Sequence, residues 1–143
     1  MGDLATGRGT VAVLADDLIW ASRLIEAVRR AGGTPVRLSS EAELATVLEA
    51  DAGAELGPGE GGRALVGVVV DLLGRRYDGV AAVERSAKAR KPVIAVAQHD
   101  DQLTRKRALT AGAARVFSYA KFFTDGPRLV EGWLLANTAE ATQ

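Results

Sequence analysis

The chain of 143 residues contains no cysteine, which excludes disulfides, thiolate metal sites and a cysteine nucleophile. Its 18 basic residues equal its 18 acidic ones, whereas a general nucleic-acid or membrane-surface binder needs an excess of Lys and Arg. No apolar run approaches the roughly 18–20 residues that span a bilayer, and the opening residues lack the apolar core of a signal peptide. We therefore expect a cytoplasmic protein that binds neither nucleic acid nor membrane.

Short apolar runs rich in β-branched residues alternate with stretches of helical spacing. The third run is continuously apolar, as in a strand that is covered on both faces in the middle of a parallel sheet. This alternation predicts an α/β fold: a flavodoxin-like, doubly wound, five-stranded parallel sheet of order 2-1-3-4-5 in three α/β/α layers. The predicted strands are 10–15, 35–38, 64–70, 92–97 and 115–119.

Several segments carry signals of helix boundaries. Leu18, Ile25 and Val28, with Trp20 and Leu24 beside them, form an apolar stripe that stops at Gly32-Gly33. The run 40–43 is a capping box, and Thr124 or Asp125 can cap a last helix with Pro127 in its first turn. We expect a flexible segment 1–9, one domain over 10–140, and a mobile glycine-rich loop over 51–62.

Three carboxylates follow two of the predicted strands. Asp16 and Asp17 end the first strand, and Asp71 ends the third, so the predicted strand order brings them together where that order reverses. Three close carboxylates repel one another unless a cation neutralises them, and oxygen ligands suit Mg²⁺. Alternatively, Asp16 and Asp17 merely cap the helix after the first strand, and Asp71 caps the helix after the third.

The order of these motifs resembles the receiver domains of two-component response regulators, of which CheY is an example. The acidic pair lies in VAVLADDLIW (11–20), the phosphoacceptor segment is VGVVVDLLGRRYDG (66–79), and PVIAVAQHDD (92–101) and AGAARVFSYA (111–120) are similar to the last two strands. The resemblance spans nearly the whole chain. It implies Asp71 as a potential phosphoacceptor, Asp16, Asp17 and Asp71 as Mg²⁺ ligands, and phosphate transfer from a histidine kinase.

The chain departs from the receiver pattern at its switch positions. Receivers end strand 4 with Thr or Ser, whereas Ala97 stands here. Their strand 5 ends in Lys, but Tyr119 takes that place and Lys121 comes two residues late. The aromatic switch residue is replaced by Val116. Ala97 cannot donate a hydrogen bond, and Val116 has no aromatic ring that could change its rotamer. A phosphate at Asp71 would therefore lack the contacts that normally favour one conformation of the domain over the other.

Other side chains near the acids are auxiliary candidates. Gln98 offers an amide in place of the missing hydroxyl, Lys121 and Arg75 offer charge, and the lone His99 follows strand 4. The aromatic residues around strand 5 and the last helix either pack in the core or form an interface on the helix 4–strand 5–helix 5 face, a homodimer included. They are Phe117, Phe122, Phe123 and Trp133.

The sequence favours a stand-alone receiver-like signalling domain that is not an enzyme. It either accepts phosphate at Asp71 or acts as a pseudo-receiver through protein–protein contacts, and the degenerate switch favours the second. One alternative is a small-molecule-binding flavodoxin-like protein, although Asp16 and Asp17 in its first loop would repel anions. The other is a purely structural interaction domain, which predicts no metal binding.

Overall fold

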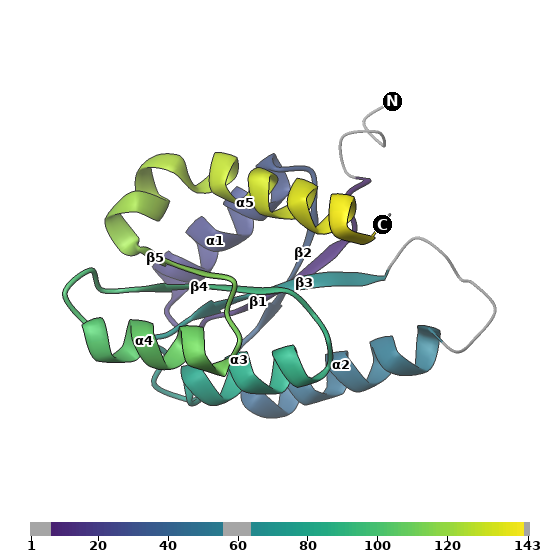
Figure 1. The fold of residues 1–143 in the computed structure, drawn as a ribbon, viewed down its shortest axis with the longest axis horizontal. Helices are drawn as coiled ribbons and strands as arrows, with labels where there is room; N and C mark the ends of the chain where they lie inside the picture. The colour runs from purple at the N-terminus through teal and green to yellow at the C-terminus, as the bar shows by residue number, and fades with distance from the viewer. Residues whose placement is uncertain (1–6, 56–63, 142–143) are drawn as a thin grey trace.

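The computed structural model describes residues 7–55 and 64–141 and contains a five-stranded parallel sheet (Figure 1). The strand order is β2-β1-β3-β4-β5, as predicted. Each strand is short and is separated from the next by a helix, which returns the chain to the same end of the sheet so that all strands run parallel. The strands are β1 (Thr10–Leu14), β2 (Thr34–Leu38), β3 (Leu65–Asp71), β4 (Val93–Ala97) and β5 (Arg115–Ser118).

The helices cover the sheet on both sides and give the predicted three layers. One face carries α1 (Leu18–Arg30) and α5 (Tyr119–Ala141), and the other carries α2 (Glu41–Glu55), α3 (Gly79–Lys88) and α4 (Gln102–Ala111) (Figure 1). Strand β3 contributes to both cores, with Val68 and Val70 facing the three-helix side and Val69 facing α1 and α5. The continuously apolar third run is therefore the buried central strand that the sequence predicted.

The predicted loop over 51–62 begins too early. Residues 51–55 continue α2, and 56–63 lie outside the described residues. Asp51 is buried in this last part of the helix. Its carboxylate accepts a hydrogen bond from the Leu65 N–H at 2.8 Å and lies 2.5 Å from the Lys91 ammonium. These contacts join α2 to the first residue of β3, which a mobile loop from Asp51 would not do.

The flexible segment predicted over 1–9 falls mostly on residues 1–6, outside the described part. Arg8, which is described, is held at both its main chain and its side chain. Its N–H donates to Gly32 O at 3.2 Å, and its guanidinium contacts Ala31 O at 3.0 Å and the Glu131 carboxylate at 2.9 Å. Arg8 is thereby attached to the end of α1 and to α5.

Two helix details also differ from the prediction. Helix α5 begins at Tyr119, because the Ser118 hydroxyl accepts a hydrogen bond from Lys121 N–H at 3.1 Å and starts the helix there; Pro127 lies inside it. Leu18 is 69% exposed. The buried face of α1 contains Leu24 and Val28 of the predicted stripe, together with Ala21 and Ala27.

Candidate functional site

Asp71 is the last residue of β3 and the buried centre of the predicted acidic site. Its side chain lies at the carboxyl ends of the strands and is 2% exposed. Burial raises the pKa of the Asp71 carboxyl, because a carboxylate loses hydration inside the protein. The charges of Asp16 and Asp17 raise this pKa further, while hydrogen bonds from Tyr119 and the Leu73 N–H partly offset the increase. The three acids therefore lie at one end of the sheet, close enough to interact electrostatically.

The closest partner of the Asp71 carboxylate is a tyrosine. The Tyr119 hydroxyl donates a hydrogen bond to Asp71 Oδ1, and the Leu73 N–H donates to the same oxygen at 3.1 Å. Burial and the neighbouring carboxylate raise the pKa of Tyr119, so its hydroxyl keeps its proton at neutral pH. The ring is packed against Trp20 of α1, with ring centroids 4.4 Å apart. Tyr119, at the position of the receiver lysine, thus contacts the acid without bringing a charge.

A second tyrosine joins the strand ends beneath this site. The Tyr77 hydroxyl lies 2.7 Å from the carbonyl oxygen of Asp71 and 3.1 Å from that of Leu14, so it connects the ends of β1 and β3. Burial is the largest cause that raises the pKa of Tyr77. The ring occupies the space that a side chain at Gly74 would need. A glycine at position 74 therefore lets the loop after β3 turn over the tyrosine.

The other two acids bind main-chain N–H groups. Asp16 Oδ2 accepts hydrogen bonds from the N–H groups of Arg75 and Arg76 at 2.8 and 2.7 Å, which attaches the loop after β3 to the end of β1. Asp17 is the N-cap of α1 and accepts from the Trp20 N–H at 3.0 Å. The capping role weighed for Asp17 is therefore present. For Asp71 it is not, since Asp78 caps α3.

The three-carboxylate Mg²⁺ site that the sequence suggested is not preformed among the described residues. In residues 7–55 and 64–141, no group of three or more His, Cys, Asp or Glu side chains is placed so that it could hold a metal ion. One oxygen of each acid already accepts a hydrogen bond from the protein, so an ion that bound this oxygen would have to compete with the donor. Mg²⁺ binding by Asp16, Asp17 and Asp71 stays a prediction.

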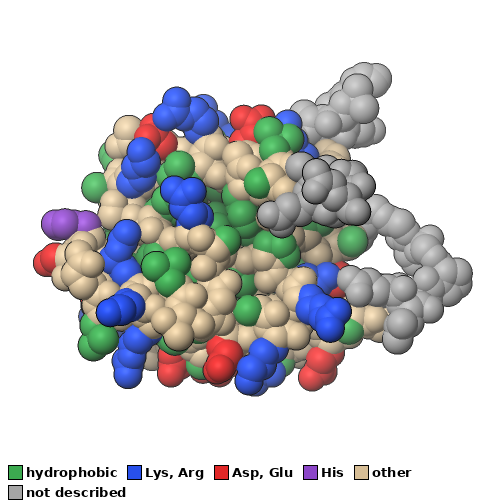
Figure 2. Space-filling model, in the orientation of Figure 1, with side chains coloured by type: hydrophobic (Ala, Val, Ile, Leu, Met, Phe, Trp, Pro, Cys, Tyr) green, Lys and Arg blue, Asp and Glu red, His purple; other side chains and the backbone are tan. Residues whose placement is uncertain are grey.

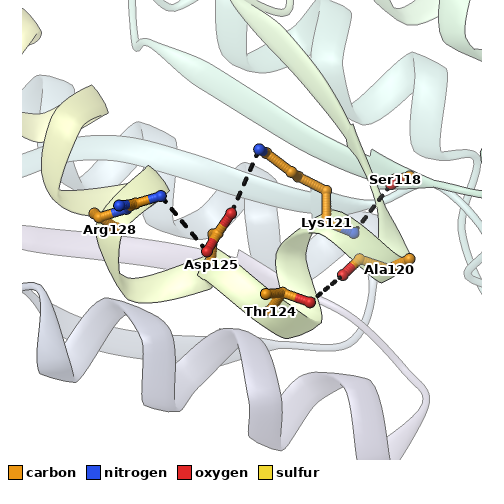
Figure 3. Close-up of polar contacts among 6 residues, drawn as sticks. All are labelled: Ser118, Ala120, Lys121, Thr124, Asp125 and Arg128. Carbon is orange, nitrogen blue, oxygen red and sulfur yellow. Dashed lines mark hydrogen bonds and ion pairs between the residues drawn. The ribbon is translucent and has the colours of Figure 1, made fainter.

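Lys121 pairs with an acid of its own helix and not with Asp71. Lys121 extends along α5 to Asp125, 3.4 Å from its carboxylate, and Arg128 reaches the other oxygen of Asp125 at 3.6 Å (Figure 3). In the same turn, the Thr124 hydroxyl donates to Ala120 O at 3.2 Å (Figure 3). Arg75 is exposed, and its main-chain N–H donates to Asp16. The late lysine therefore does not substitute for the one that Tyr119 replaces.

The remaining switch positions belong to the core or to the surface. Ala97 ends β4 and is fully buried, and Val116 of β5 is 9% exposed and packs in the core on the side of α2, α3 and α4. The Val116 carbonyl oxygen accepts a hydrogen bond from the Arg105 guanidinium of α4 at 3.1 Å. Gln98 and His99 are exposed after β4.

Sequence reasoning missed the contributions of Tyr77 and Trp20 to this site. Tyr77 was not among the candidate site residues, and Trp20 was expected only in an apolar stripe. In the structure the first joins two strand ends and the second supports Tyr119. The available signal was chemical: a Tyr six residues after Asp71, and aromatic residues after both β1 and β5, can place hydroxyls and rings over a buried acid.

No protein-family model matches the chain, and no curated protein matches it in sequence. Among the described residues, no helix has the length and apolar character needed to cross a bilayer. Solved structures do match. A CheY-like receiver domain protein from Methanospirillum hungatei JF-1 shares 15% identity and a TM-score of 0.72, over 92% of this chain and 98% of that one.

Two further matches have the same fold. A receiver domain from Rhodospirillum rubrum shares 20% identity and a TM-score of 0.66, over 88% of this chain and 94% of that one. A response regulator from Burkholderia pseudomallei, with a phosphorylated aspartic acid, a calcium ion and citrate, shares 14% identity and a TM-score of 0.63, over 93% and 72%. With its strand order and helix layers, the chain thus has the fold of response regulator receiver domains, of the CheY-like type.

Proposed function

We propose that this chain is a pseudo-receiver, a non-enzymatic signalling domain that acts through protein–protein contacts without an aspartyl phosphate. The observation that carries the proposal is the hydrogen bond from the Tyr119 hydroxyl to Asp71 Oδ1. Formation of an aspartyl phosphate requires a carboxylate oxygen of Asp71 to attack phosphorus. Tyr119 and the Leu73 N–H both donate to Oδ1, which makes that oxygen a weaker nucleophile.

The groups that would stabilise a phosphoryl group support the same proposal. Receiver chemistry needs a cation, a hydroxyl and a metal beside the acceptor, because the transferred group carries spread negative charge. Here Lys121 pairs with Asp125, Ala97 has no hydroxyl, and Asp16 binds the loop after β3. A phosphoryl group at Asp71 would meet two neighbouring carboxylates and a neutral phenol.

The partner surface that we favour is the α4–β5–α5 face. It carries exposed apolar side chains from two helices: Leu109 of α4 is 49% exposed, and Leu135 of α5 is 52% exposed. Of the aromatic residues predicted to be core or interface, Phe117, Phe122 and Trp133 are buried and only Phe123 is exposed. An interface on this face, with a signalling protein or a second copy, would therefore use leucines of α4 and α5.

The test is the response to beryllofluoride with Mg²⁺, a phosphoryl mimic, followed by ¹H–¹⁵N NMR. The expected result is no saturable shift of the Leu73, Ala97 or Tyr119 amides, and wild-type partner binding by Asp71→Asn. The phosphate-accepting alternative predicts a saturable, Mg²⁺-dependent shift that Asp71→Asn abolishes. That outcome would overturn the pseudo-receiver proposal while leaving the receiver fold intact.

A further inference from the structure

A groove of about 650 Å³ lies under α5, at the opposite end of the sheet from Asp71. Its walls come from the starts of β4 and β5 and from one side of α5, including Pro92, Ala114 and Leu129. Figure 2 shows hydrophobic side chains gathered in a hollow near the centre of this face, with Lys and Arg side chains around it. The volume lies in the range of roughly 300–1,000 Å³ that is typical of small-molecule sites.

The charged side chains that line the groove are all positive. Arg115 of β5 and Arg128 of α5 line it, and no acidic residue does so within the described chain. The Arg115 guanidinium lies 5.4 Å from the centre of the Phe117 ring, which is another lining residue. The Arg128 side chain is 79% exposed and 3.6 Å from Asp125, so this long contact leaves it accessible to solvent. The groove therefore combines an apolar interior with a positive rim.

Two buried hydrogen-bond donors belong to the same lining. Trp133 is 7% exposed, and neither its Nε1 nor the Nδ2 of Asn137 has a hydrogen-bond partner among the described residues. These residues are four apart on α5 and so lie on one side of the helix. A buried donor without an acceptor is costly, and native proteins keep few of them. A ligand that brings an acceptor oxygen would complement both.

We propose that this groove binds an organic anion with an apolar body, of the aromatic or aliphatic carboxylate class. The apolar walls would bury the body, the guanidinium groups would pair with the carboxylate, and the donors of α5 would complement its oxygens. The site shares no residue with Asp71 and its partners, and it does not depend on the proposed function. Such a ligand would bind the domain at the end of the sheet opposite Asp71.

The test uses naphthalene-2-carboxylate and its neutral amide, naphthalene-2-carboxamide, as matched probes. The chain has two tryptophans, so a ¹H–¹⁵N spectrum contains two indole N–H signals. Trp133 lines the groove, while Trp20 packs on Tyr119 at the other end of the sheet. The carboxylate should shift the Trp133 signal saturably and leave Trp20 unchanged, and the amide should bind at least about tenfold more weakly, because it lacks the charge.

A glycine of α5 supplies the blocking variant. A Cβ at Gly132 would have nothing within 4 Å, so we chose Gly132→Leu to extend a side chain from the groove lining. Gly53 of α2 also has open space at its Cβ, and Gly53→Leu is the matched control, since both changes raise helix propensity. Gly132→Leu should abolish carboxylate binding, Arg115→Gln and Arg128→Gln should weaken it, and Gly53→Leu should not change it. Equal binding of the amide, an equal shift of Trp20, or unchanged binding by Gly132→Leu would overturn the proposal.

Discussion

The indole of Trp133 occupies the place where Gly67 lacks a side chain. A Cβ at Gly67 would stand 2.5 Å from Cη2 and 2.7 Å from Cζ2 of the ring, well inside van der Waals contact. Gly67 lies in β3 and Trp133 in α5, so a side chain at position 67 would meet the last helix where it packs on the central strand. The glycine is needed for packing, since its backbone is that of an ordinary strand residue.

Gly67→Ala should destabilise the domain by about 1–3 kcal/mol, the usual cost of overpacking a filled core. Urea unfolding followed by circular dichroism measures the change. In a Trp133→Leu background the alanine should cost much less, because the ring that it meets is gone. Equal costs in both backgrounds would show that Gly67 and Trp133 are not coupled.

Asp71→Asn should be more stable than the wild type at neutral pH. The pKa of Asp71 is raised by folding, so the folded protein holds this proton more tightly than the unfolded chain does. The wild type therefore loses stability as pH rises from the ordinary value of 3.8 through the raised pKa, whereas Asn does not titrate. Urea midpoints across this pH range should show the advantage of Asp71→Asn shrinking as pH falls.

Asp101→Asn is the control for this pH series, because the shift at Asp101 has the opposite sign. Asp101 accepts a hydrogen bond from the Thr104 N–H. Hydrogen bonding by Thr104 lowers the pKa of Asp101. Its contribution to stability is present above the ordinary pKa and is lost as pH falls through the lowered one. A parallel trend in both variants would contradict the assignment of the Asp71 effect to burial.

The buried pair between Asp51 and Lys91 should matter far more than the surface pairs. Asp51→Ala is expected to cost about 3–5 kcal/mol, because it leaves the Lys91 ammonium in a site that is 12% exposed and removes the acceptor of the Leu65 N–H. Glu84→Ala, which breaks the exposed pair with Lys88, should cost less than about 1 kcal/mol. Thermal melts of the two variants compare them directly, and similar shifts would refute the structural role of Asp51.

Restoring the receiver residues should restore a response at Asp71. The double variant Ala97→Thr/Tyr119→Lys supplies the missing hydroxyl and cation and removes the phenol from Asp71 Oδ1. We expect a saturable Mg²⁺-dependent beryllofluoride shift in this variant but not in the wild type. Tyr119→Phe is the control, since it frees the oxygen without adding a charge. A response of Tyr119→Phe equal to that of the double variant would mean that the hydroxyl alone blocks the site.

The strands and the sheet order could be predicted because they follow from local patterns. Runs such as 64–70 are apolar and β-branched, and regular alternation with helices leaves few topologies open. Helix ends were less predictable. The extension of α2 through Asp51 depends on Lys91 and on the Leu65 N–H, both distant in sequence. The start of α5 at Tyr119 depends on the Ser118 hydroxyl.

The site was predictable in position but not in chemistry. The topology brings Asp16, Asp17 and Asp71 to one end of the sheet, and their mutual effect on the Asp71 pKa follows from that placement. Which donors those acids meet depends on side-chain packing. From the sequence, Tyr119 was identified only as the residue that replaces the receiver lysine. In the structure its ring packs against Trp20, and its hydroxyl reaches Asp71. No local pattern encodes that contact.

The hydrogen bonds from the Arg75 and Arg76 N–H groups to Asp16 have a consequence for exchange with solvent. Both residues are exposed, so their amides would exchange rapidly if the carboxylate did not hold them. Any cation that takes Asp16 Oδ2 must release these two amides, and its binding free energy is reduced by the cost of opening the loop. Deuterium uptake at positions 75 and 76 therefore measures whether Asp16 still holds the loop after β3.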